Sequence, residues 1–247
     1  MAANLVLSSS SVATYLRCRH AYLLGYVYRM PKRGSVRALI GTAAHAGIEA
    51  MLKGGRSADA AVLEAWDLEV GTIPADELAA DPAALPDARK IPGVYRASVL
   101  PEYTPDLVEV GFAVVPKGLG VVVTGVIDNA DSKTDDVRDV KTTAGKTVND
   151  VKPSFSPESY DLQLGLYRLG YYGLTGRWPK QMRLDVLTRT GKHRFYDREP
   201  STADALDLVS IARDGINASD YEPTGALNGS CIWCEYRLRC AHAKVDA

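Results

Sequence analysis

An apolar strand that ends in a carboxylate constrains this chain more than any other feature. The run Val121–Ile127 is rich in β-branched residues, which favour buried strands, and Asp128 follows it directly. The polar residues 129–136 then predict a turn, and Val137–Lys141 predicts the returning strand of a hairpin. A buried strand rarely ends in a charged group that lacks a partner. The hairpin therefore predicts a polar site at the end of its first strand.

The returning strand supplies partners for Asp128. Side chains alternate between the two faces of a strand, so Asp139 and Lys141 point the same way while Val140 points into the core. Two carboxylates close together repel each other, and removing them from water is costly unless a cation compensates. The sequence therefore predicts that Asp128, Asp139 and Lys141 meet at one place.

These three residues allow two interpretations. Oxygen ligands suit a hard divalent ion such as Mg²⁺ or Mn²⁺, which polarises a phosphodiester and lowers the pKa of bound water. Lys141 would then position the attacking water or stabilise the charge of the transition state. In the plainer interpretation, Lys141 forms a salt bridge with Asp139 and Asp128 caps a turn. Short motifs often match by chance, so these residues alone favour the plainer interpretation.

Together with motifs elsewhere in the chain, the hairpin resembles the PD-(D/E)XK nuclease superfamily. Its G-V-I-D sequence ends at Asp128, and D-V-K begins at Asp139, about a dozen residues later. Further motifs resemble the RecB-like branch, which includes nuclease domains of bacterial recombination helicases, CRISPR-associated exonucleases and stand-alone phage exonucleases. These motifs are Gly41-x-x-x-His45, Glu109 followed by Phe112, Gln163-x-x-x-Tyr167, and one early cysteine with a late C-x2-C-x5-C.

The resemblance implies an α/β fold with a restriction-endonuclease-like core, in which helices flank a central mixed β-sheet. It also implies an N-terminal helical region that a four-cysteine cluster clasps to the C-terminus. We expect one nuclease domain over residues 1–247. Its parts would be a mainly helical lobe over 1–105, the catalytic sheet and helix over 106–200, and the C-terminal helix with the cysteine cluster over 201–247.

Hydrophobic periodicity and capping residues place the elements along the chain. Residues 73–105 predict short helices and loops, because alanine, proline and aspartate are frequent there. Helices are predicted over Ser8–Tyr28, Arg37–Lys53, Ser57–Gly71, Ser156–Gly173 and Thr202–Ile216, and strands near Leu107, over Met182–Thr190 and over His193–Asp197.

The resemblance also implies roles for the residues of the site. His45, Asp128, Asp139 and the backbone carbonyl of Val140 would hold the metal, and Lys141 would act with the two aspartates in catalysis. A histidine on a helix is more often packed or solvated than a metal ligand. The metal role of His45 therefore follows from the resemblance, not from the residue itself.

Three more residues are expected to support the site. Gln163 and Tyr167 lie four residues apart and share one helix face, and the resemblance implies that they hold the DNA backbone beside the active site. Packing in the core is the alternative for a helical tyrosine. Glu109 lies on a strand among apolar neighbours, where a carboxylate usually has a partner. The resemblance places it near the metal, and a structural ion pair is the alternative.

The four cysteines are Cys18, Cys231, Cys234 and Cys240. Four thiolates can hold a structural zinc ion or an iron–sulfur cluster, and either would join the two ends of the chain. Disulfides are disfavoured because the chain has no recognisable secretory signal. Spacing alone slightly favours zinc, whereas the resemblance implies a 4Fe-4S cluster. Trp233 and Tyr236 would shield such a cluster from solvent.

Charge is distributed unevenly along the chain. The net charge of -1 argues against a generic nucleic-acid binder. Residues 1–56 nevertheless contain eight basic residues and one acidic residue, and residues 57–110 contain three basic and eleven acidic residues. A basic patch that faces DNA, with an acidic surface elsewhere, would fit this division, because phosphate contacts need local charge. Solvated helix faces are the alternative.

Composition places the chain among ordinary globular proteins, with 46% apolar and 24% charged residues. The N-terminus lacks the basic region of a signal peptide, and no apolar run reaches the roughly 18 residues that a membrane span needs. We therefore expect a cytoplasmic protein with no membrane partner.

These observations together predict a metal-dependent DNA exonuclease that hydrolyses phosphodiester bonds at single-stranded ends and carries a structural 4Fe-4S cluster. One alternative is a non-catalytic DNA-binding module. Another is an accessory factor that trims DNA ends within a recombination or CRISPR adaptation complex, whose proteins would then be its partners.

Overall fold

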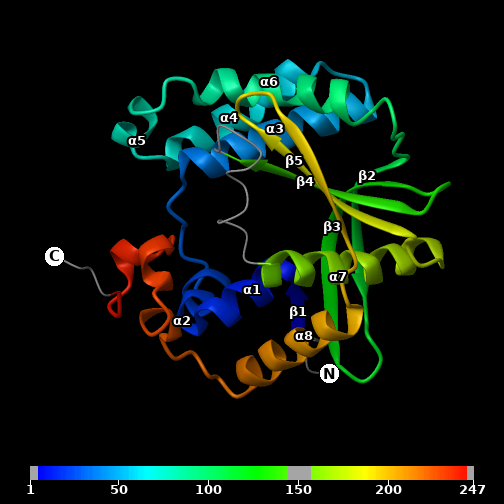
Figure 1. Ribbon diagram of the computed structural model, residues 1–247. Coiled ribbons are helices and arrows are strands. Elements are labelled where there is room, and N and C mark those ends of the chain that lie inside the picture. The colour runs from blue at the N-terminus through cyan, green and yellow to red at the C-terminus, as the bar shows by residue number, and fades with distance from the viewer. Residues whose placement is uncertain (1–4, 144–156, 244–247) are drawn as a thin grey trace.

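A mixed six-stranded β-sheet forms the centre of the protein (Figure 1). The computed structural model describes residues 5–143 and 157–243. Strands β1 and β3 pair in parallel, as do β4 and β5, and the other pairs are antiparallel. The strands are β1 Leu5–Ser8, β2 Leu107–Val114, β3 Val121–Asp131, β4 Asp136–Thr143, β5 Gln181–Thr188 and β6 His193–Arg198.

Helices cover both faces of this sheet, which confirms the predicted α/β class (Figure 1). On one face, α1, α7 and α8 pack with β3 in one hydrophobic cluster. On the other face, α3, α4 and α6 form a second cluster that includes Val140 of β4 and Leu187 of β5. The helices are α1 Ser9–Arg17, α2 Arg19–Tyr22, α3 Val36–Lys53, α4 Ala58–Glu69, α5 Ala75–Ala79, α6 Ala84–Ser98, α7 Pro157–Thr175 and α8 Thr202–Asn217.

One edge of β3 is open between two neighbouring strands. β2 pairs along β3, so β1 and β4 must share the opposite edge. There β1 lies beside Val121–Thr124, and β4 lies beside Asn129–Asp131. None of the described strands pairs with residues 125–128 on that edge. Asp128 therefore lies at the point where β4 separates from β3.

The N-terminal segment differs from its prediction in two ways. Residues Leu5–Ser8 form β1, which the sequence did not reveal because four residues are too few for a clear alternation. The helix predicted over Ser8–Tyr28 breaks at Cys18, whose backbone is extended with φ −158° and ψ 111°. This break matters because Cys18 lines a cavity together with the three C-terminal cysteines.

Two further elements extend beyond their predictions. β3 continues through Asn129–Asp131, where the polar sequence predicted a turn. Asn129 is tolerated in this buried strand because its side-chain oxygen accepts a hydrogen bond from the Tyr95 hydroxyl at 2.9 Å. Tyr95 belongs to α6, a helix of 15 residues in a region where we predicted short helices and loops. The predicted first residue of α7, Ser156, lies outside the described residues.

The segment after α8 returns to the first two helices in short 3₁₀ turns (Figure 1). The Tyr15 hydroxyl donates a hydrogen bond to the carbonyl of Asp220 at 2.9 Å. Farther along, the Asn228 amide donates to the carbonyl of Arg17 at 2.9 Å. These contacts hold residues 220–240 against α1 and α2 and bring the two cysteine-bearing parts of the chain together.

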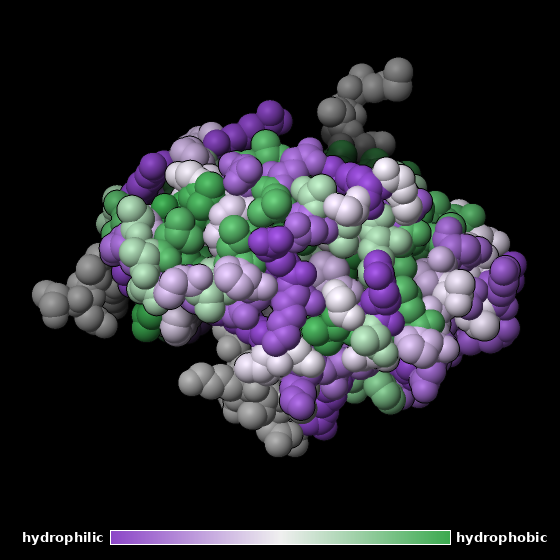
Figure 2. Space-filling view, turned by 90° about the horizontal axis from the view of Figure 1, so that it is seen from above, coloured by the Kyte–Doolittle hydropathy of each residue, from purple (hydrophilic) through white to green (hydrophobic). Residues whose placement is uncertain are grey.

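The outer surface over α3, α4 and α6 mixes residue types. Seen from above, hydrophilic and hydrophobic residues are interspersed over this layer (Figure 2). The continuous apolar side of these helices is the one that packs together and on the sheet. Within the described ranges, no helix has both the length and the apolar character that crossing a bilayer requires.

Asp135 fixes the turn between β3 and β4 to the end of α7. Its backbone has φ +58°, and its carboxylate accepts hydrogen bonds from the Tyr171 hydroxyl at 2.8 Å and Arg177 Nε at 2.9 Å. Lys180 Nζ lies 3.1 Å from the same carboxylate. These donors, of which Tyr171 has the largest effect, lower the pKa of Asp135 to about 2. The negative charge of Asp135 therefore stabilises the turn.

We expect Asp135→Asn to lower the urea midpoint of unfolding at neutral pH. Asparagine tolerates the same left-handed backbone and keeps an acceptor for Tyr171, so this change isolates the charge. Because the carboxyl has a lower pKa in the folded state, its contribution is complete above about pH 4 and is lost as the pH falls toward about 2. Urea titrations at decreasing pH should show the two proteins converging. A difference that stays constant with pH would contradict this role.

Candidate metal and catalytic site

An open groove of about 700 Å³ lies between α3 and the opening in the sheet. Helix α3 contributes Arg37 and His45 to its lining, and the strands contribute Glu109, Asp128 and Lys141. The fold therefore brings residues from four separate elements to one surface.

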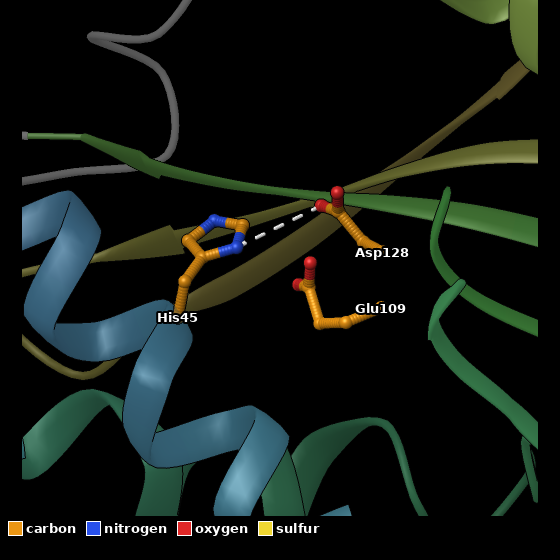
Figure 3. A group of neighbouring side chains, drawn as sticks. All are labelled: His45, Glu109 and Asp128. Atoms are coloured by element: carbon orange, nitrogen blue, oxygen red, sulfur yellow. Dashed lines mark ion pairs between the residues drawn. The ribbon is translucent and has the colours of Figure 1, made fainter. Parts of the chain in front are cut away.

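His45, Glu109 and Asp128 point toward one another in this groove (Figure 3). Each offers one ligand atom, and these atoms all lie within 4.8 Å of one another. His45 Nδ1 is 3.8 Å from Asp128 Oδ2, and the side chains of these two residues are 30% and 12% exposed. The three groups are therefore close enough to share one ion and remain accessible from the groove.

Two glycines allow α3 to bring His45 to this position. A Cβ at Gly41 would lie 3.1 Å from Thr142 Oγ1 of β4. A Cβ at Gly47 would lie 2.6 Å from Pro92 Cγ of α6, so any side chain there would displace the neighbouring helix. The Gly41-x-x-x-His45 motif thus has a physical basis, since the glycine permits the close approach of α3 to β4 that places His45 at the groove.

Glu109 reaches the groove from β2. The register that pairs Val108 with Asn129 places Glu109 opposite Asp128. Glu109 has φ +48°, a conformation that residues other than glycine rarely adopt and that is concentrated at functional sites. Burial raises the pKa of Glu109 to about 7, and repulsion by Asp128 and Glu49 adds to the rise. A nearby cation would favour its ionised form.

Asp128 joins the groove to the sheet. Its Oδ2 accepts a hydrogen bond from the backbone N–H of Val140 at 2.8 Å, which links β3 to β4 beyond their last paired residues. Its Oδ1 accepts a longer hydrogen bond from the Tyr167 hydroxyl at 3.4 Å. Both oxygens of Asp128 are therefore held in place while Oδ2 stays near His45.

Asp139 and Lys141 form an ion pair beside the groove. Lys141 Nζ lies 2.8 Å from Asp139 Oδ1 and 2.7 Å from Oδ2, and Asp139 is completely buried. Burial raises the pKa of Asp139 to about 7 despite the attraction of Lys141, and Asp128 adds to the rise. Burial also opposes the charge on Lys141, but attraction by Asp139 and then Asp128 outweighs it and raises the pKa of Lys141. The salt bridge of the plainer interpretation thus exists, and it lies within the site.

Gln163 and Tyr167 of α7 connect Lys141 to Asp128. Gln163 Oε1 accepts a hydrogen bond from Lys141 Nζ at 3.0 Å, and Gln163 Nε2 donates to the Tyr167 hydroxyl at 2.8 Å. Burial, followed by the charges of Asp128 and Asp139, raises the pKa of Tyr167 well above its ordinary value. Tyr167 therefore keeps its proton and donates a hydrogen bond to Asp128, which closes a chain of hydrogen bonds around the site.

Phe112 of β2 determines how closely α7 approaches the sheet. Its ring occupies the space that a side chain would take at Gly125 of β3 and at Gly170 of α7. The rings of Phe112 and Tyr167 meet edge to face, with centroids 6.3 Å apart. The aromatic residue that follows Glu109 in the sequence motif therefore orients the helix that carries Gln163 and Tyr167.

The predicted metal ligands occupy two neighbouring groups. His45 and Asp128 lie together, and Glu109, which we expected to support the site, supplies the third ligand atom of the group. Asp139 instead directs its carboxylate to Lys141. The side chain of Val140 packs into the core of the helical layer, as its position on the strand predicted.

Sequence reasoning gave no site role to several polar residues that line the groove, among them Arg37, Thr142 and Tyr160. Lys141 Nζ lies 5.5 Å from the centre of the Tyr160 ring. Tyr160 precedes Gln163 by three residues and so shares its helix face, a signal that could have identified it. Thr142 follows Lys141 directly and Arg37 precedes Gly41 by four residues, but neither matches a pattern of its own.

The donor groups of the groove fit a hard divalent ion. One imidazole and two carboxylates would leave coordination positions for water and a phosphate oxygen. A bound cation would also offset the repulsion between Glu109 and Asp128 that contributes to the raised pKa of Glu109. Residues that repel one another in the free protein are thus those that would share the ion.

The four cysteines line one small cavity of about 20 Å³. A Cβ at Gly225 would lie 3.1 Å from Cys18 Sγ and 3.7 Å from Cys231 Sγ, so the absence of a side chain there makes room for the thiols. Tyr236 is buried beside the cysteines, as we expected. Trp233 is 83% exposed, so the prediction that it shields the thiols was wrong; it ends a short 3₁₀ turn on the surface.

Solved structures show similarity at the level of the fold. The crystal structure of a candidate exonuclease from Eubacterium rectale, at 2.19 Å resolution, has a TM-score of 0.62 and 15% identity, and the match covers 88% of this chain and 83% of that chain. The crystal structure of SSO0001 has a TM-score of 0.42 and 12% identity over 87% of this chain and 89% of that chain, a weak similarity. No match was found among curated proteins.

A family comparison covers nearly the whole sequence. The model of the PD-(D/E)XK nuclease superfamily matches residues 6–241, which include the hairpin of Asp128, the helix of His45 and all four cysteines. The matched region folds into a mixed sheet flanked by helices, in which Asp128 and Lys141 line one groove and the buried Asp139 pairs with Lys141 beside it. This chain therefore belongs to the PD-(D/E)XK nuclease superfamily.

Proposed function

We propose that this protein is a metal-dependent deoxyribonuclease that degrades DNA from free, single-stranded ends. The observation that carries the proposal is the convergence of His45, Glu109 and Asp128 in a groove that also holds Lys141. Hydrolysis of a phosphodiester requires an activated water and stabilisation of the charge that develops on the phosphate. His45, Glu109 and Asp128, which we call the metal cradle, lie beside the fixed ammonium group of Lys141, and together they can supply the activated water and the charge stabilisation. Membership of a nuclease superfamily supports this reaction class.

The metal ligands would come from α3 and three strands. The ligand atoms of His45, Glu109 and Asp128 are already grouped, and we propose that Asp139 and the backbone carbonyl of Val140 complete the set. When bound, Mg²⁺ or Mn²⁺ would polarise the phosphodiester and lower the pKa of water. The chain contributes the alignment of the donors, because the N–H of Val140 fixes the carboxylate of Asp128.

Lys141 would act on the phosphate and on the attacking water. Asp139 and Gln163 hold its ammonium group at distances of 2.7–3.0 Å, so the charge needs little reorganisation during the reaction. Gln163 also binds Tyr167, which donates to Asp128. The helix α7 would therefore keep the ammonium group and the metal-binding carboxylate at a constant separation.

The preference for ends and for single strands is the finer part of the proposal. The structure from Eubacterium rectale that shares the fold is described as that of a candidate exonuclease, which supports action at ends. The resemblance to the RecB-like branch supports DNA, and recombination or CRISPR proteins remain predicted partners. Arg37, which lines the same groove as His45, supplies a positive charge for a phosphate there.

For the cysteines we propose a 4Fe-4S cluster with a structural role. A tetrahedral zinc site would place its sulfur atoms about 3.8 Å apart, because each Zn–S bond is about 2.3 Å long. Among the residues that the structure describes, no three cysteine sulfurs lie within 4.8 Å of one another. This spacing argues against a ready tetrahedral zinc site, and the RecB-like pattern of one early cysteine with a late C-x2-C-x5-C supports an iron–sulfur cluster.

Asp128→Asn and Lys141→Ala should each reduce Mn²⁺-dependent degradation of end-labelled, linear single-stranded DNA by at least about 100-fold. Asparagine at 128 keeps an acceptor for the Val140 N–H, so loss of activity would reflect the missing charge. Asp59→Asn, on the exposed surface of α4, is the control and should leave the rate unchanged. Undiminished degradation by either site variant would show that the site is misassigned, and equal cleavage of circular DNA would contradict action at ends.

Tyr167→Phe and Tyr171→Phe form a matched pair on α7. Tyr167 bonds to Asp128 at the groove, whereas Tyr171, one turn later, bonds to Asp135 at the distant turn. We expect Tyr167→Phe to lower kcat about three- to tenfold, the effect of one lost hydrogen bond. Tyr171→Phe should lower the urea midpoint and leave kcat unchanged. Equal losses of kcat in both variants would show that these hydroxyls act only through the stability of the helix.

The metal content of protein purified without oxygen tests the cysteine proposal. We expect a brown protein that contains iron and acid-labile sulfide, and Cys18→Ser should lose both. Because the cluster is proposed as a structural clasp, its loss should also lower the melting temperature. Colourless protein that contains zinc and no acid-labile sulfide would establish the zinc alternative.

A further inference from the structure

The connection between the cysteine region and α3 concentrates positive charge. Residues 28–37, which we call the basic strap, contain no acidic residue and four basic ones: Arg29, Lys32, Arg33 and Arg37. Arg33 lies 2.6 Å from Glu77 in an ion pair. Within the described ranges, the other three have no acidic side chain at ion-pair distance, and all three are exposed. The strap therefore offers three unpaired cations to solvent.

Two exposed arginines of the helical layer are neutralised, whereas Arg96 of α6 is exposed and has no ion pair among the described residues. On the helical layer, Arg56 pairs with Glu64, and Arg89 pairs with Asp59. An exposed cation with a carboxylate partner must give up that partner before it binds a phosphate, whereas an unpaired one gives up only water and counterions. The strap differs in that three such unpaired cations lie within ten residues that contain no acidic side chain, which suits it to an anionic ligand.

The strap is fixed near both of its ends. Met30 packs against the cysteine region, and its N–H donates to the carbonyl of Leu24 at 2.9 Å. Toward α3, the N–H of Gly34 donates to the carbonyl of Thr72 at 3.3 Å, and the Ser35 hydroxyl caps α3. A backbone that is already held in place loses less entropy when a ligand binds. The backbone of the strap is therefore held in position before a ligand binds.

The α3 end of the strap opens into the metal groove. Ser35 and Arg37 line this groove together with His45. Figure 1 shows the connection running from α2 to the start of α3, along the side of the molecule between the cysteine region and the helical layer. A ligand that followed the strap would therefore arrive at the metal cradle.

Exposed aromatic surface accompanies these charges at the other end of the strap. Tyr28 is 63% exposed, and Lys32 Nζ lies 5.6 Å from the centre of the Tyr26 ring. Single-stranded nucleic acid is bound by this combination, in which cations contact phosphates and an aromatic face stacks on an unpaired base. Bases within a duplex are stacked on one another and offer no free face to Tyr28.

We propose that the basic strap is the track along which a single-stranded DNA end enters the metal groove. Arg29 and Lys32 contact the phosphates of the incoming strand, and Tyr28 stacks on one of its bases. Arg37 holds the phosphate nearest to the cradle. This inference rests on the proposed nuclease function for the identity of the ligand, and it adds the surface that selects a single strand.

The test measures binding without catalysis. A fluorescent single-stranded oligonucleotide and a blunt duplex of equal length are titrated with the full-length protein in EDTA at several salt concentrations, and anisotropy is recorded. The strap variant carries Arg29→Gln, Lys32→Gln and Arg37→Gln. The control variant carries Arg56→Gln, Arg89→Gln and Lys117→Gln, which remove the same charge from exposed positions away from the strap. Urea midpoints of both variants check that the fold is retained.

We expect the strap variant to bind the single strand at least about tenfold more weakly and to lower the slope of log K against log salt by about two, since each phosphate contact contributes about 0.7. The control variant should bind like the original protein. Tyr28→Ala should weaken single-strand binding by about fivefold or more without changing the salt slope, because stacking releases no counterions. Duplex binding should be unaffected by Tyr28→Ala.

Three results would overturn the proposal. They are single-strand affinity that is equal in the strap variant and the original protein, an equal loss in the control variant, and an equal loss of duplex binding in Tyr28→Ala. Failure of the nuclease proposal would look different. In that case the original protein would bind single strands through the strap in EDTA and yet release no nucleotides when Mn²⁺ is supplied.

Discussion

The hydrogen bond from the Val140 N–H to the Asp128 carboxylate is the contact on which the rest of the structure depends. β4 pairs with β3 only at Asn129–Asp131 and separates from it at Asp128. There the carboxylate of Asp128 accepts the hydrogen bond that a main-chain carbonyl would accept if the two strands continued to pair. The separation lets α3 approach Asp128 from one face of the sheet and α7 from the other. The carboxylate of Asp128 therefore links the two strands where they separate and also lines the groove. Donors to both of its oxygens stabilise its negative charge in a largely buried position.

Around that carboxylate, the folded protein holds acidic side chains close together although they repel one another. Glu109, Asp128 and Asp139 lie close enough to interact, and burial together with mutual repulsion raises the pKa of Glu109 and of Asp139 to about 7. Glu109 also adopts a left-handed backbone conformation, which costs about 1–3 kcal/mol. Such an arrangement persists only because the surrounding packing determines it, as at Phe112, whose ring fills the space left by two glycines. A divalent ion would relieve the repulsion that the folded chain maintains.

The sequence was sufficient to predict those elements and site residues that follow a hydrophobic periodicity or a sequence motif. The β-branched run before Asp128, the D-V-K triplet and the four-residue spacing of Gln163 and Tyr167 each predicted elements that the structure contains. It was not sufficient where a long-range partner decides the outcome. Asn129 belongs to a strand because Tyr95 of a distant helix donates a hydrogen bond to its side-chain oxygen, and Cys18 breaks a helix that its neighbours favour. The resemblance placed Glu109 near the site, but its position opposite Asp128 comes from the register of β2 against β3, which no local pattern reveals.

The order in which the chain is synthesised determines when the cysteine cavity can form. It takes one thiol from residue 18 and three from residues 231–240, and Met30 at the start of the strap packs in the same cluster. A ribosome releases these parts in order, so every residue of the groove is made several seconds before the last cysteine at ordinary rates of translation. A nascent chain would therefore contain all residues of the groove before the basic strap is anchored to the cysteine region. Synthesis of the last cysteine would then be the step that fixes the start of the strap against the rest of the protein.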